Sequence, residues 1–353
     1  MATRRYRPKI LVSAGSLVAA ASLALSACGI GQSSANAELQ AGWSSLTSSS
    51  QVTLAVHVDA APSQLEALPG HPSAADAGLV AGGSVVVQAA SASGQPLSSL
   101  GSTSGNLQQR LSALRLDVLG ELHGSPLVEL RLVGGVLYGQ LNVAGLDSVL
   151  AGFGQNLTTL EGQLPSGVVS NPAVQALFNG KWVSLDLGSL SSELHSAGIQ
   201  LNQSGGVPSA AEVGGLLDAV TATFNKEVSV ARVGTSAQLG TDLLLSTDRH
   251  KFATELESSL ARTAPGLVTS KDTSKASAVP HGPLSVHAFV SGRTLTRISV
   301  DVSQLTGRGQ LPAGTQVPLV VDVSHAPVSI TAPAGAVPLD VRTLLQEAMS
   351  VSP

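Results

Sequence analysis

Residues 114–141 read LRLDVLGELHGSPLVELRLVGGVLYGQL, and this stretch decides the fold. Apolar side chains fall at alternate positions in Leu114–Leu122, Leu127–Val133 and Val136–Val143, which is the period of a strand with one buried face. The pair Gly134-Gly135 separates the last two segments, and two glycines supply the positive φ angles that a tight hairpin turn requires. The stretch therefore predicts three consecutive antiparallel strands.

Alternation of the same kind recurs on both sides of this meander and predicts more strands. They are Val52–Val58, Val85–Val87, Lys181–Leu187, Val228–Val233, Ala237–Leu245, Leu284–Val290, Leu295–Val302, Val317–Val323 and Val328–Ile330. Helical spacing predicts helices over 38–48, 210–227 and 248–262, the last with Thr247 as its N-cap, and a closing helix over 339–349 that Asp340 begins. Strands and helices do not alternate regularly, so the sequence predicts an α+β fold with a mostly antiparallel sheet.

Composition limits both the core and the partners. Charged residues make up 12% of the 353 residues and aromatic residues 3%, whereas a typical domain has about 25% charged residues. The core must therefore be built from Val, Leu, Ile and Ala. The formal net charge is −4, so the chain lacks the basic surface that nucleic acid requires, and we expect no nucleic-acid partner.

The first 28 residues follow the three-part plan of an export signal. Cationic residues up to Lys9 precede an apolar stretch, Ile10–Leu25, which is broken by serine and glycine and is shorter than the roughly 20 apolar residues of a spanning helix. Leu25, Ser26, Ala27 and Cys28 follow, and they resemble a bacterial lipobox. This resemblance implies that residues 1–27 are removed and that Cys28 carries a diacylglycerol. The alternative is ordinary secretory cleavage near Ala27, which leaves a free thiol.

Cys28 is the only cysteine in the chain, so no internal disulfide can form. Two acyl chains give stable membrane anchoring where one gives marginal binding. We therefore expect a protein held on the extracytoplasmic face of the cell membrane by its lipid anchor. Residues 28–37 are rich in Gly, Ser and Asn and predict a flexible tether, followed by a single domain over 38–353.

The order of motifs resembles the LppX, LprA, LprF and LprG family of actinobacterial envelope lipoproteins. The resemblance is carried by the lipobox and by five segments: LRLVGGVLYGQL (130–141), GKWVSLDL (180–187), VARVGTSAQLGTDLLLSTDRHKFATEL (230–256), PLSVHAFVSGRTLTRISVDVS (283–303) and VPLVVDVSHAPVSITAP (317–333). It covers most of the chain after the signal. This chain is longer than the family pattern at about 60–111 and 144–217, which are predicted insertions.

The resemblance implies a strongly curved, mostly antiparallel sheet, a half-barrel, with helices packed on its concave face and an apolar cavity between them. Members of that family bind lipids or acylated glycolipids and are thought to move them outward from the membrane. The alternating apolar sets that we expect to line such a cavity are Leu116, Val118, Leu130, Leu132, Val286 and Ala288. The alternative is that these side chains pack as an ordinary filled core.

Motifs for chemistry are missing from the sequence. The nearest string to a nucleophile elbow, Gly101–Gly105, has Thr103 at the nucleophile position and lies in a low-complexity loop. The eight histidines lack the spacing of a metal site; His57, His123 and His287 are expected on strands and facing solvent. Glu129 and Arg131 share one strand face, which predicts a charged outer surface. No catalytic residue, metal or cofactor is predicted.

These observations predict a membrane-anchored, non-enzymatic lipoprotein that binds, and transfers, a lipid or acylated glycolipid in an apolar cavity. The alternative is a scaffold lipoprotein with a filled core that holds another envelope protein. A third possibility, an envelope enzyme with an unrecognised site, requires polar groups that converge in a cleft, and the sequence indicates none.

Overall fold

The computed structural model describes residues 34–68, 70, 72–102, 107–162, 164, 166–196, 210–263, 279–305, 311–312, 314–340 and 342. Internal contacts divide the chain into two compact units. Unit 1 consists of Met1–Ser44 and Gly205–Thr294, and unit 2 consists of Ser45–Ser204 and Leu295–Pro353. Each unit is described by itself.

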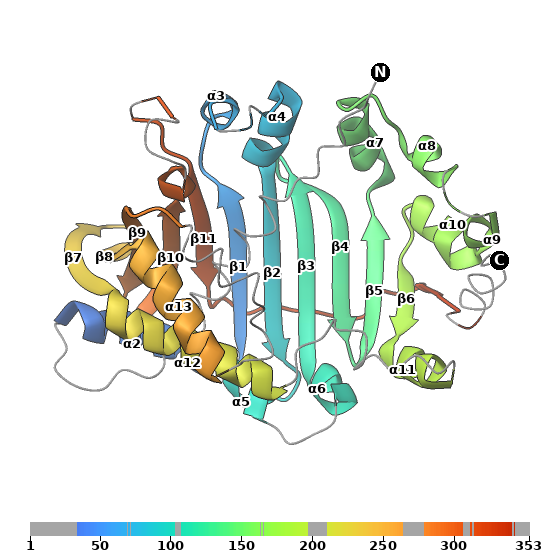
Figure 1. Ribbon diagram of the computed structural model, residues 1–353. Coiled ribbons are helices and arrows are strands. Elements are labelled where there is room, and N and C mark those ends of the chain that lie inside the picture. The colour runs from blue at the N-terminus through green and yellow to red at the C-terminus, as the bar shows by residue number, and fades with distance from the viewer. Residues whose placement is uncertain are drawn as a thin grey trace. The chain divides into compact units, whose positions relative to one another are not determined.

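Unit 2 is built on an open sheet whose described strands are, in chain order, β1 (Gln51–Val58), β2 (Gly83–Ser91), β3 (Leu114–Leu122), β4 (Ser125–Val133), β5 (Val136–Leu141), β6 (Val183–Asp186), β10 (Thr294–Asp301), β11 (Pro318–Ser324) and β12 (Val337–Pro338) (Figure 1). Their spatial order is β12-β6-β5-β4-β3-β2-β1-β11-β10. Neighbouring strands are antiparallel except for the short parallel pair β12 and β6.

The helices of unit 2 are short and gather at the ends of its strands. They are α3 (Pro62–Glu66), α4 (Ala74–Gly82), α5 (Leu97–Ser102), α6 (Leu107–Ala113), α7 (Val143–Ala151), α8 (Leu157–Glu161), α9 (Ser166–Ser170), α10 (Pro172–Phe178), α11 (Leu187–Ser196) and a 3-10 turn, Val302–Leu305. In Figure 1, α3, α4 and α7 lie at one end of the strands, and α5, α6 and α11 lie at the other. The described helices of this unit therefore border the sheet.

Side-chain caps explain where several of these helices begin. Ser73 accepts a hydrogen bond from the Asp76 amide at 3.2 Å and donates its own amide to the Asp76 carboxylate, which is a capping box. Asn142 accepts from the Gly145 amide at 3.1 Å and so ends β5 two residues before the predicted limit. Asn171 caps α10 ahead of a proline at the first helical position.

Unit 1 combines a three-stranded antiparallel sheet with three longer helices. Its elements are α2 (Ser34–Ser48, of which the residues to Ser44 belong to this unit), α12 (Ala210–Glu227), β7 (Ser229–Ser236), β8 (Gly240–Asp248), α13 (Arg249–Thr263) and β9 (Pro283–Ser291). β8 lies between β7 and β9. α2 is bound to this sheet through Glu38, which pairs with Arg232 at 2.6 Å. α12 and α13 pack on each other, and the Thr263 hydroxyl donates to the Gly215 carbonyl at 2.7 Å.

Positive φ angles mark the hairpin turns. Gly134 and Gly135 have φ of 63° and 83°, as the predicted primed turn requires. The β3–β4 turn uses His123, with φ of 49°, in the same role. His123 therefore lies in a turn, and its predicted place on a strand is wrong. Its ring packs against Gly82, where an added Cβ would lie 2.2 Å from a ring carbon.

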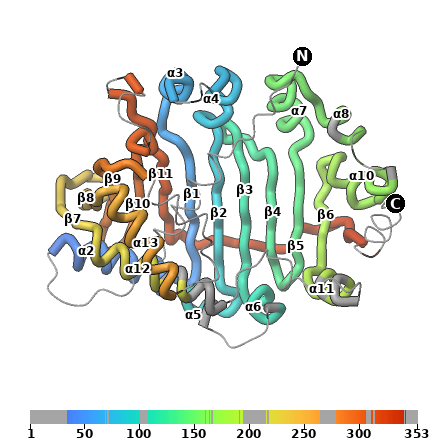
Figure 2. Tube along the Cα trace, in the orientation of Figure 1, coloured from blue at the N-terminus to red at the C-terminus, as the bar shows by residue number. Residues whose placement is uncertain are grey.

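An extended segment that we call the C-terminal strap, residues 325–336, crosses the sheet of unit 2 from β11 to β12. Its Val328 amide donates to the Gln51 side chain at 3.3 Å, and its Thr331 carbonyl accepts from Arg131 at 3.4 Å. Ile330 is 2% exposed and fixes the strap to the sheet. Figure 2 traces this path behind the central strands.

The predicted α+β class with a mostly antiparallel sheet is confirmed, and β3 and α12 have the bounds that the sequence predicted. The predicted strand Val328–Ile330 is wrong, since these residues form the strap and bond to side chains in place of a strand ladder. The N-cap prediction for α13 is also wrong. Asp248 accepts from the His250 and Lys251 amides, because its carboxylate reaches both where Thr247 does not. Most of the predicted helix 339–349 lies outside the described residues.

The strap yields a test of stability. Replacing Ile330 with alanine leaves a cavity between strap and sheet, and we expect the free energy of unfolding to fall by about 2–5 kcal/mol. Replacing the neighbouring exposed Ser329 with alanine is the matched control, with an expected change within about 0.5 kcal/mol. Urea denaturation measures both. Equal effects of the two substitutions would contradict the anchoring role of Ile330.

Candidate functional site

The register of the strands sorts the side chains of unit 2 onto two chemically distinct faces. Residues directly opposite each other in antiparallel strands point to the same face. One set of alternate positions is almost wholly aliphatic, and we call it the apolar face. The other carries the charged and aromatic side chains of the central strands, and we call it the polar face.

The apolar face consists of three rows that run across the strands. The first row is Val321, Val56, Val85, Gly120, Val128 and Leu141; the second is Val323, Leu54, Val87, Val118, Leu130, Gly139 and Val183; the third is Val52, Ala89, Leu116, Leu132, Leu137 and Leu185. None of these residues is charged or aromatic. Together they give an aliphatic surface that is several strands wide.

Two side chains of the apolar face are exposed to solvent, whereas others, such as Val52, Leu132 and Val321, are buried. Val85 is 44% exposed and Leu130 is 41% exposed, although both are large aliphatic side chains in the middle of a sheet. A Cβ placed on Gly139 would lie 3.4 Å from a Leu130 methyl group, so Leu130 leans over the space that the glycine leaves. Gly120 lies in the next row and has only backbone nearby. The two glycines make the surface uneven at the point where it is most exposed.

Four of the six side chains predicted to line a cavity meet on this face. Leu116 lies opposite Leu132, and Val118 lies opposite Leu130. The other two belong to unit 1, where Val286 lies opposite Leu245 and Ala288 opposite Leu243. Ala288 and Leu243 are 2% and 0% exposed, so this pair packs as core.

The polar face of unit 2 is organised around Arg131. Its guanidinium bonds to Glu129, lies 3.2 Å from Asp117, and has its centre 5.0 Å from the Trp182 ring. The predicted association of Glu129 and Arg131 on one charged surface is therefore confirmed. A second group lies on β10, β11 and β1, where Arg297 pairs with Asp322 at 2.6 Å. The strap described above passes over this face through its bond to Arg131.

Asp117 is the one described carboxyl group whose pKa is raised above its ordinary value. Burial is the main cause, and the neighbouring Glu129 charge adds to it, while Arg131 acts in the opposite direction. One carboxylate oxygen, Oδ1, is buried without a hydrogen-bond partner. The Arg131 guanidinium thus pairs with both Glu129 and Asp117. Its charge offsets only part of the cost of burying the ionised Asp117 carboxylate.

Two of the described histidines, His250 and His281, come together from distant segments, and the others lie apart on different elements. His287 bonds to Asp242 at 2.9 Å on unit 1, and His57 lies 3.9 Å from Asp322 on unit 2. The His281 and His250 rings lie 4.2 Å apart, centre to centre, at an angle of 42°, and His281 contacts Asp248. Within the described ranges, no group of three or more His, Cys, Asp or Glu residues is arranged to hold a metal ion.

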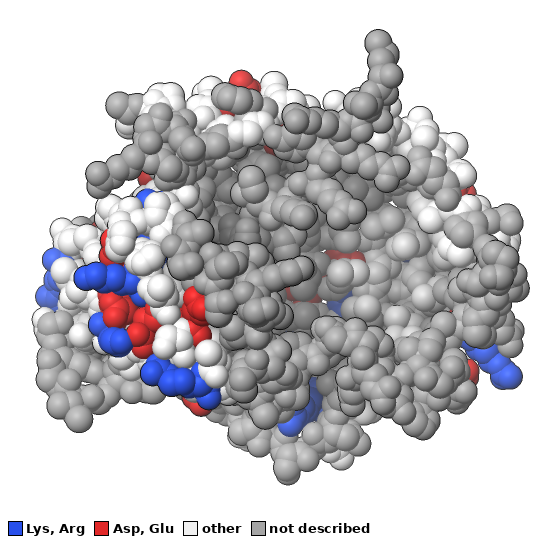
Figure 3. Space-filling model, in the orientation of Figure 1, with Lys and Arg blue, Asp and Glu red and all other residues white. Residues whose placement is uncertain are grey.

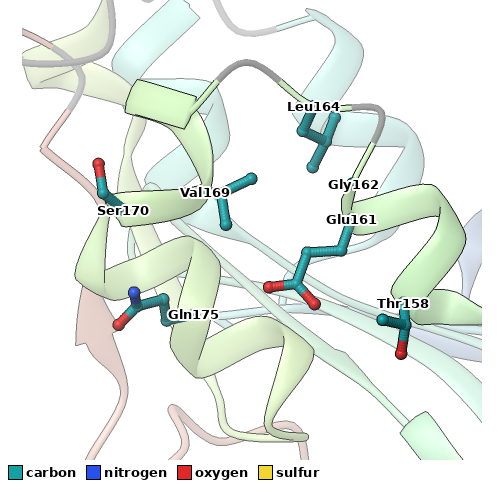
Figure 4. A pocket seen from close by; sticks show the side chains of 7 residues that line it. All are labelled: Thr158, Glu161, Gly162, Leu164, Val169, Ser170 and Gln175. Atoms are coloured by element: carbon teal, nitrogen blue, oxygen red, sulfur yellow. The ribbon is translucent and has the colours of Figure 1, made fainter.

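A surface pocket of about 560 Å³ lies among α8, α9 and α10 and is shown in Figure 4. Its lining residues are Thr158, Glu161, Gly162, Leu164, Val169, Ser170 and Gln175. Glu161 is the only ionisable group among them, and neither a base nor a cation accompanies it. This lining offers no nucleophile and base pair and no metal ligand set.

Charged residues of both signs gather over α12 and α13 of unit 1 (Figure 3). Glu255 lies at the centre of this group, where it bonds to Lys226 and lies 3.3 Å from Arg262. These contacts hold the Glu255 pKa below its ordinary value, the Lys226 hydrogen bond most of all. The cluster is exposed and contains paired charges, which is typical of a solvated helix pair.

The predicted lipidation site lies outside the described residues, together with the lipobox Leu25, Ser26 and Ala27 that precedes Cys28. No helix among the described residues has the length and hydropathy needed to cross a membrane. Lipidation of Cys28 and membrane anchoring therefore stay predictions.

Comparisons with known proteins give a loose structural likeness. No protein-family model matches the sequence, and no curated protein matches it. Among solved structures, the chain is similar to the crystal structure of the Mycobacterium tuberculosis lipoprotein LppX, with 12% sequence identity and a TM-score of 0.31. The superposition covers 84% of this chain and 97% of that one. A likeness this loose does not assign the chain to a family or a function.

Asp117 yields a prediction about pH. Because its folded pKa is raised, the folded state binds the proton more tightly than the unfolded state, and the contribution of Asp117 to stability falls as pH rises through that pKa. Asp117→Asn keeps the site neutral. We therefore expect the stability of this variant relative to wild type to rise from about pH 4 to about pH 7, as measured by urea denaturation.

Asp186→Asn is the control of opposite sign. The Gly188 and Ser189 amides bond to the Asp186 carboxylate and lower its pKa, so the ionised form stabilises the fold above the unfolded pKa. This variant should lose stability relative to wild type over the same rise in pH. A parallel response of the two variants would contradict the assignment at Asp117.

Proposed function

We propose that this chain is a lipid-anchored envelope protein without enzymatic activity, and that it binds the acyl chains of a lipid or acylated glycolipid on the apolar face of unit 2. The observation that carries the proposal is the exposure of Val85 and Leu130 at the centre of an aliphatic surface. Exposed apolar area of this kind marks a site for an apolar partner.

The chemistry of the three rows supports an acyl chain as the ligand. Aliphatic side chains offer no hydrogen bond and no charge, so they favour a partner that needs neither. Burial of each methylene group contributes about 0.8 kcal/mol, and a long chain therefore binds without a polar motif. The charged side chains of the central strands are on the opposite face, around Arg131 and Asp322. A polar headgroup therefore lies beyond the three rows.

The position of Gly120 and Gly139 supports binding along the sheet. Both lack side chains beside the exposed centre, and Leu130 can move over the space at Gly139. The missing side chains at these two positions let a flexible chain approach the backbone of the sheet. Binding of this kind requires no nucleophile, metal or cofactor, and transfer of the lipid to another carrier is part of the proposal.

A scaffold role is the second candidate, and the same exposed patch supports it. Exposed aliphatic side chains such as Val85 and Leu130 also suit the apolar centre of a protein interface. In that case the partner is another envelope protein and the bound ligand is absent. The two candidates differ in what remains attached to the purified protein.

Native mass spectrometry of the chain from Gly29 onward, purified from an actinobacterial host, separates the candidates. A lipid of defined mass at one-to-one stoichiometry is the result that the carrier role predicts, and solvent extraction then identifies its class. A ligand-free mass that does not change when lipids are added would exclude the carrier role and favour the scaffold.

Leu130→Asp tests the face directly. The substitution puts a charge at the exposed centre of the second row, and we expect the affinity for a fluorescent fatty acid to fall about tenfold or more, because the carboxylate must be desolvated against the acyl chain. The fold should persist, since Leu130 is 41% exposed. Fluorescence titration measures the affinity, and circular dichroism checks the fold.

Thr53→Asp is the matched control, because Thr53 lies on the polar face with uncharged cross-strand neighbours, Gln88 and Ser324. It adds the same charge to the same sheet and should leave the affinity unchanged. Equal losses in both variants would indicate a general effect of charge, and an unchanged affinity in Leu130→Asp would remove the apolar face as the binding site.

A further inference from the structure

The anchor that we propose at Cys28 limits how unit 1 can lie at the membrane. Ser34, where α2 begins, is only six positions after Cys28. Fully extended, six residues span about 20 Å, so Ser34 stays within about that distance of the lipid surface. The orientation of unit 1 therefore depends on which part of it lies next to the first turns of α2.

Glu38 identifies that part. It lies four residues after Ser34, which is about 6 Å along a helix. Its carboxylate pairs with Arg232 of β7 at 2.6 Å and accepts a hydrogen bond from Thr241 at the start of β8, and these contacts lower the Glu38 pKa. The first turns of α2 are thus fixed at the end of the three-stranded sheet where β8 begins.

Two hairpin turns lie at the same end. The β7–β8 turn, residues 236–240, leads directly into Thr241. Val290 lies opposite Thr241, so β9 finishes here and passes into the turn with Gly292 and Arg293. A Cβ on Gly240 would lie 2.2 Å from the Val290 carbonyl oxygen, which shows how closely the two turns are packed. We call this region, with the first turns of α2, the anchor end of unit 1.

The anchor end has the chemistry of a surface that meets anionic lipid. Arg293 is exposed at a turn and has no ion pair among the described residues. The Arg232 side chain is 53% exposed and pairs with Glu38. Val233 lies at a β-bulge of the edge strand β7 and is 50% exposed. Arginine is attracted to anionic headgroups, and an aliphatic side chain beside it enters the interface.

We propose that the anchor end of unit 1, with Arg293 and Val233 at its surface, docks on an anionic lipid membrane and directs the Asp248 end of β8 away from it. This inference rests on the lipid anchor in the proposed function. β8 has seven residue steps between Thr241 and Asp248, a distance of about 23 Å. Lys251 follows Asp248, is exposed, and therefore marks the distal end.

Single-cysteine labelling tests the orientation. Lipidation consumes the thiol of Cys28, the only cysteine of the chain, so Val233→Cys and Lys251→Cys each offer one site for a fluorophore. The full-length lipidated protein is reconstituted in vesicles of phosphatidylcholine and phosphatidylglycerol that contain a headgroup nitroxide lipid. We expect the label at position 233 to be quenched several-fold more strongly than the label at position 251. Equal or reversed quenching overturns the proposal.

Charge and anchor are tested separately in the same vesicles. In the Val233→Cys background, Arg293→Asp should reduce the quenching and Arg293→Lys should retain it. Arg293→Asn is the control for conformation, because asparagine and aspartate both tolerate the positive φ of 72° at this position. Unchanged quenching in Arg293→Asp overturns the electrostatic contact. Failure of the wild-type protein to float with vesicles, or labelling of its Cys28, instead shows that the anchor is absent and overturns the premise.

Discussion

The register between β3 and β4 is the constraint on which the arrangement of unit 2 depends. Leu116 faces Leu132 and Asp117 faces Arg131, so one alignment places the aliphatic rows on one side and the ion pairs on the other. A slip of one residue would exchange the two faces along the whole strand. The ion pair of Asp117 with Arg131 and the tight turn at His123-Gly124 oppose such a slip from the middle and from the end of the hairpin. The neighbouring strands take their orientation from this pair through their own ladders.

Arg131 also connects the sheet to the end of the chain. The same guanidinium bonds to Glu129, approaches Asp117 and donates to the Thr331 carbonyl of the strap. The incomplete pairing of Asp117 costs stability when that residue is ionised. This arrangement keeps the charges on the polar face and leaves the apolar face free of them. The chemical difference between the two faces therefore depends on the strand register and on the ion pairs that a few charged side chains form on the polar face.

Local patterns predicted the strands well, and contacts distant in sequence were harder to predict. The alternation in Leu114–Leu122 fixed β3 to the residue, because a strand with one aliphatic side has a period of two wherever it lies. The strap was missed because Val328 and Ile330 alternate like a strand, while Gln51 and Arg131, which bond to Val328 and Thr331, lie far away in sequence. The choice of Asp248 over Thr247 as N-cap depends on which side chain points back along the helix. Four cavity candidates share a face because their spacing is that of one strand pair, whereas the burial of Ala288 follows from packing within unit 1.

Unit 1 interrupts unit 2 in the chain, since residues 205–294 separate the two parts of the larger unit. β1 pairs with β11, and Leu54 and Val323, which lie opposite each other, are 269 positions apart (323 − 54). Loop closure over such a distance is slow, so folding of this sheet is limited by topology. During synthesis from the N-terminus, one edge of β1 stays without its β11 partner until the last tenth of the sequence is made. An unpaired edge associates readily with other strands, and the interval between synthesis of β1 and of β11 is therefore the period in which this protein is most exposed to aggregation.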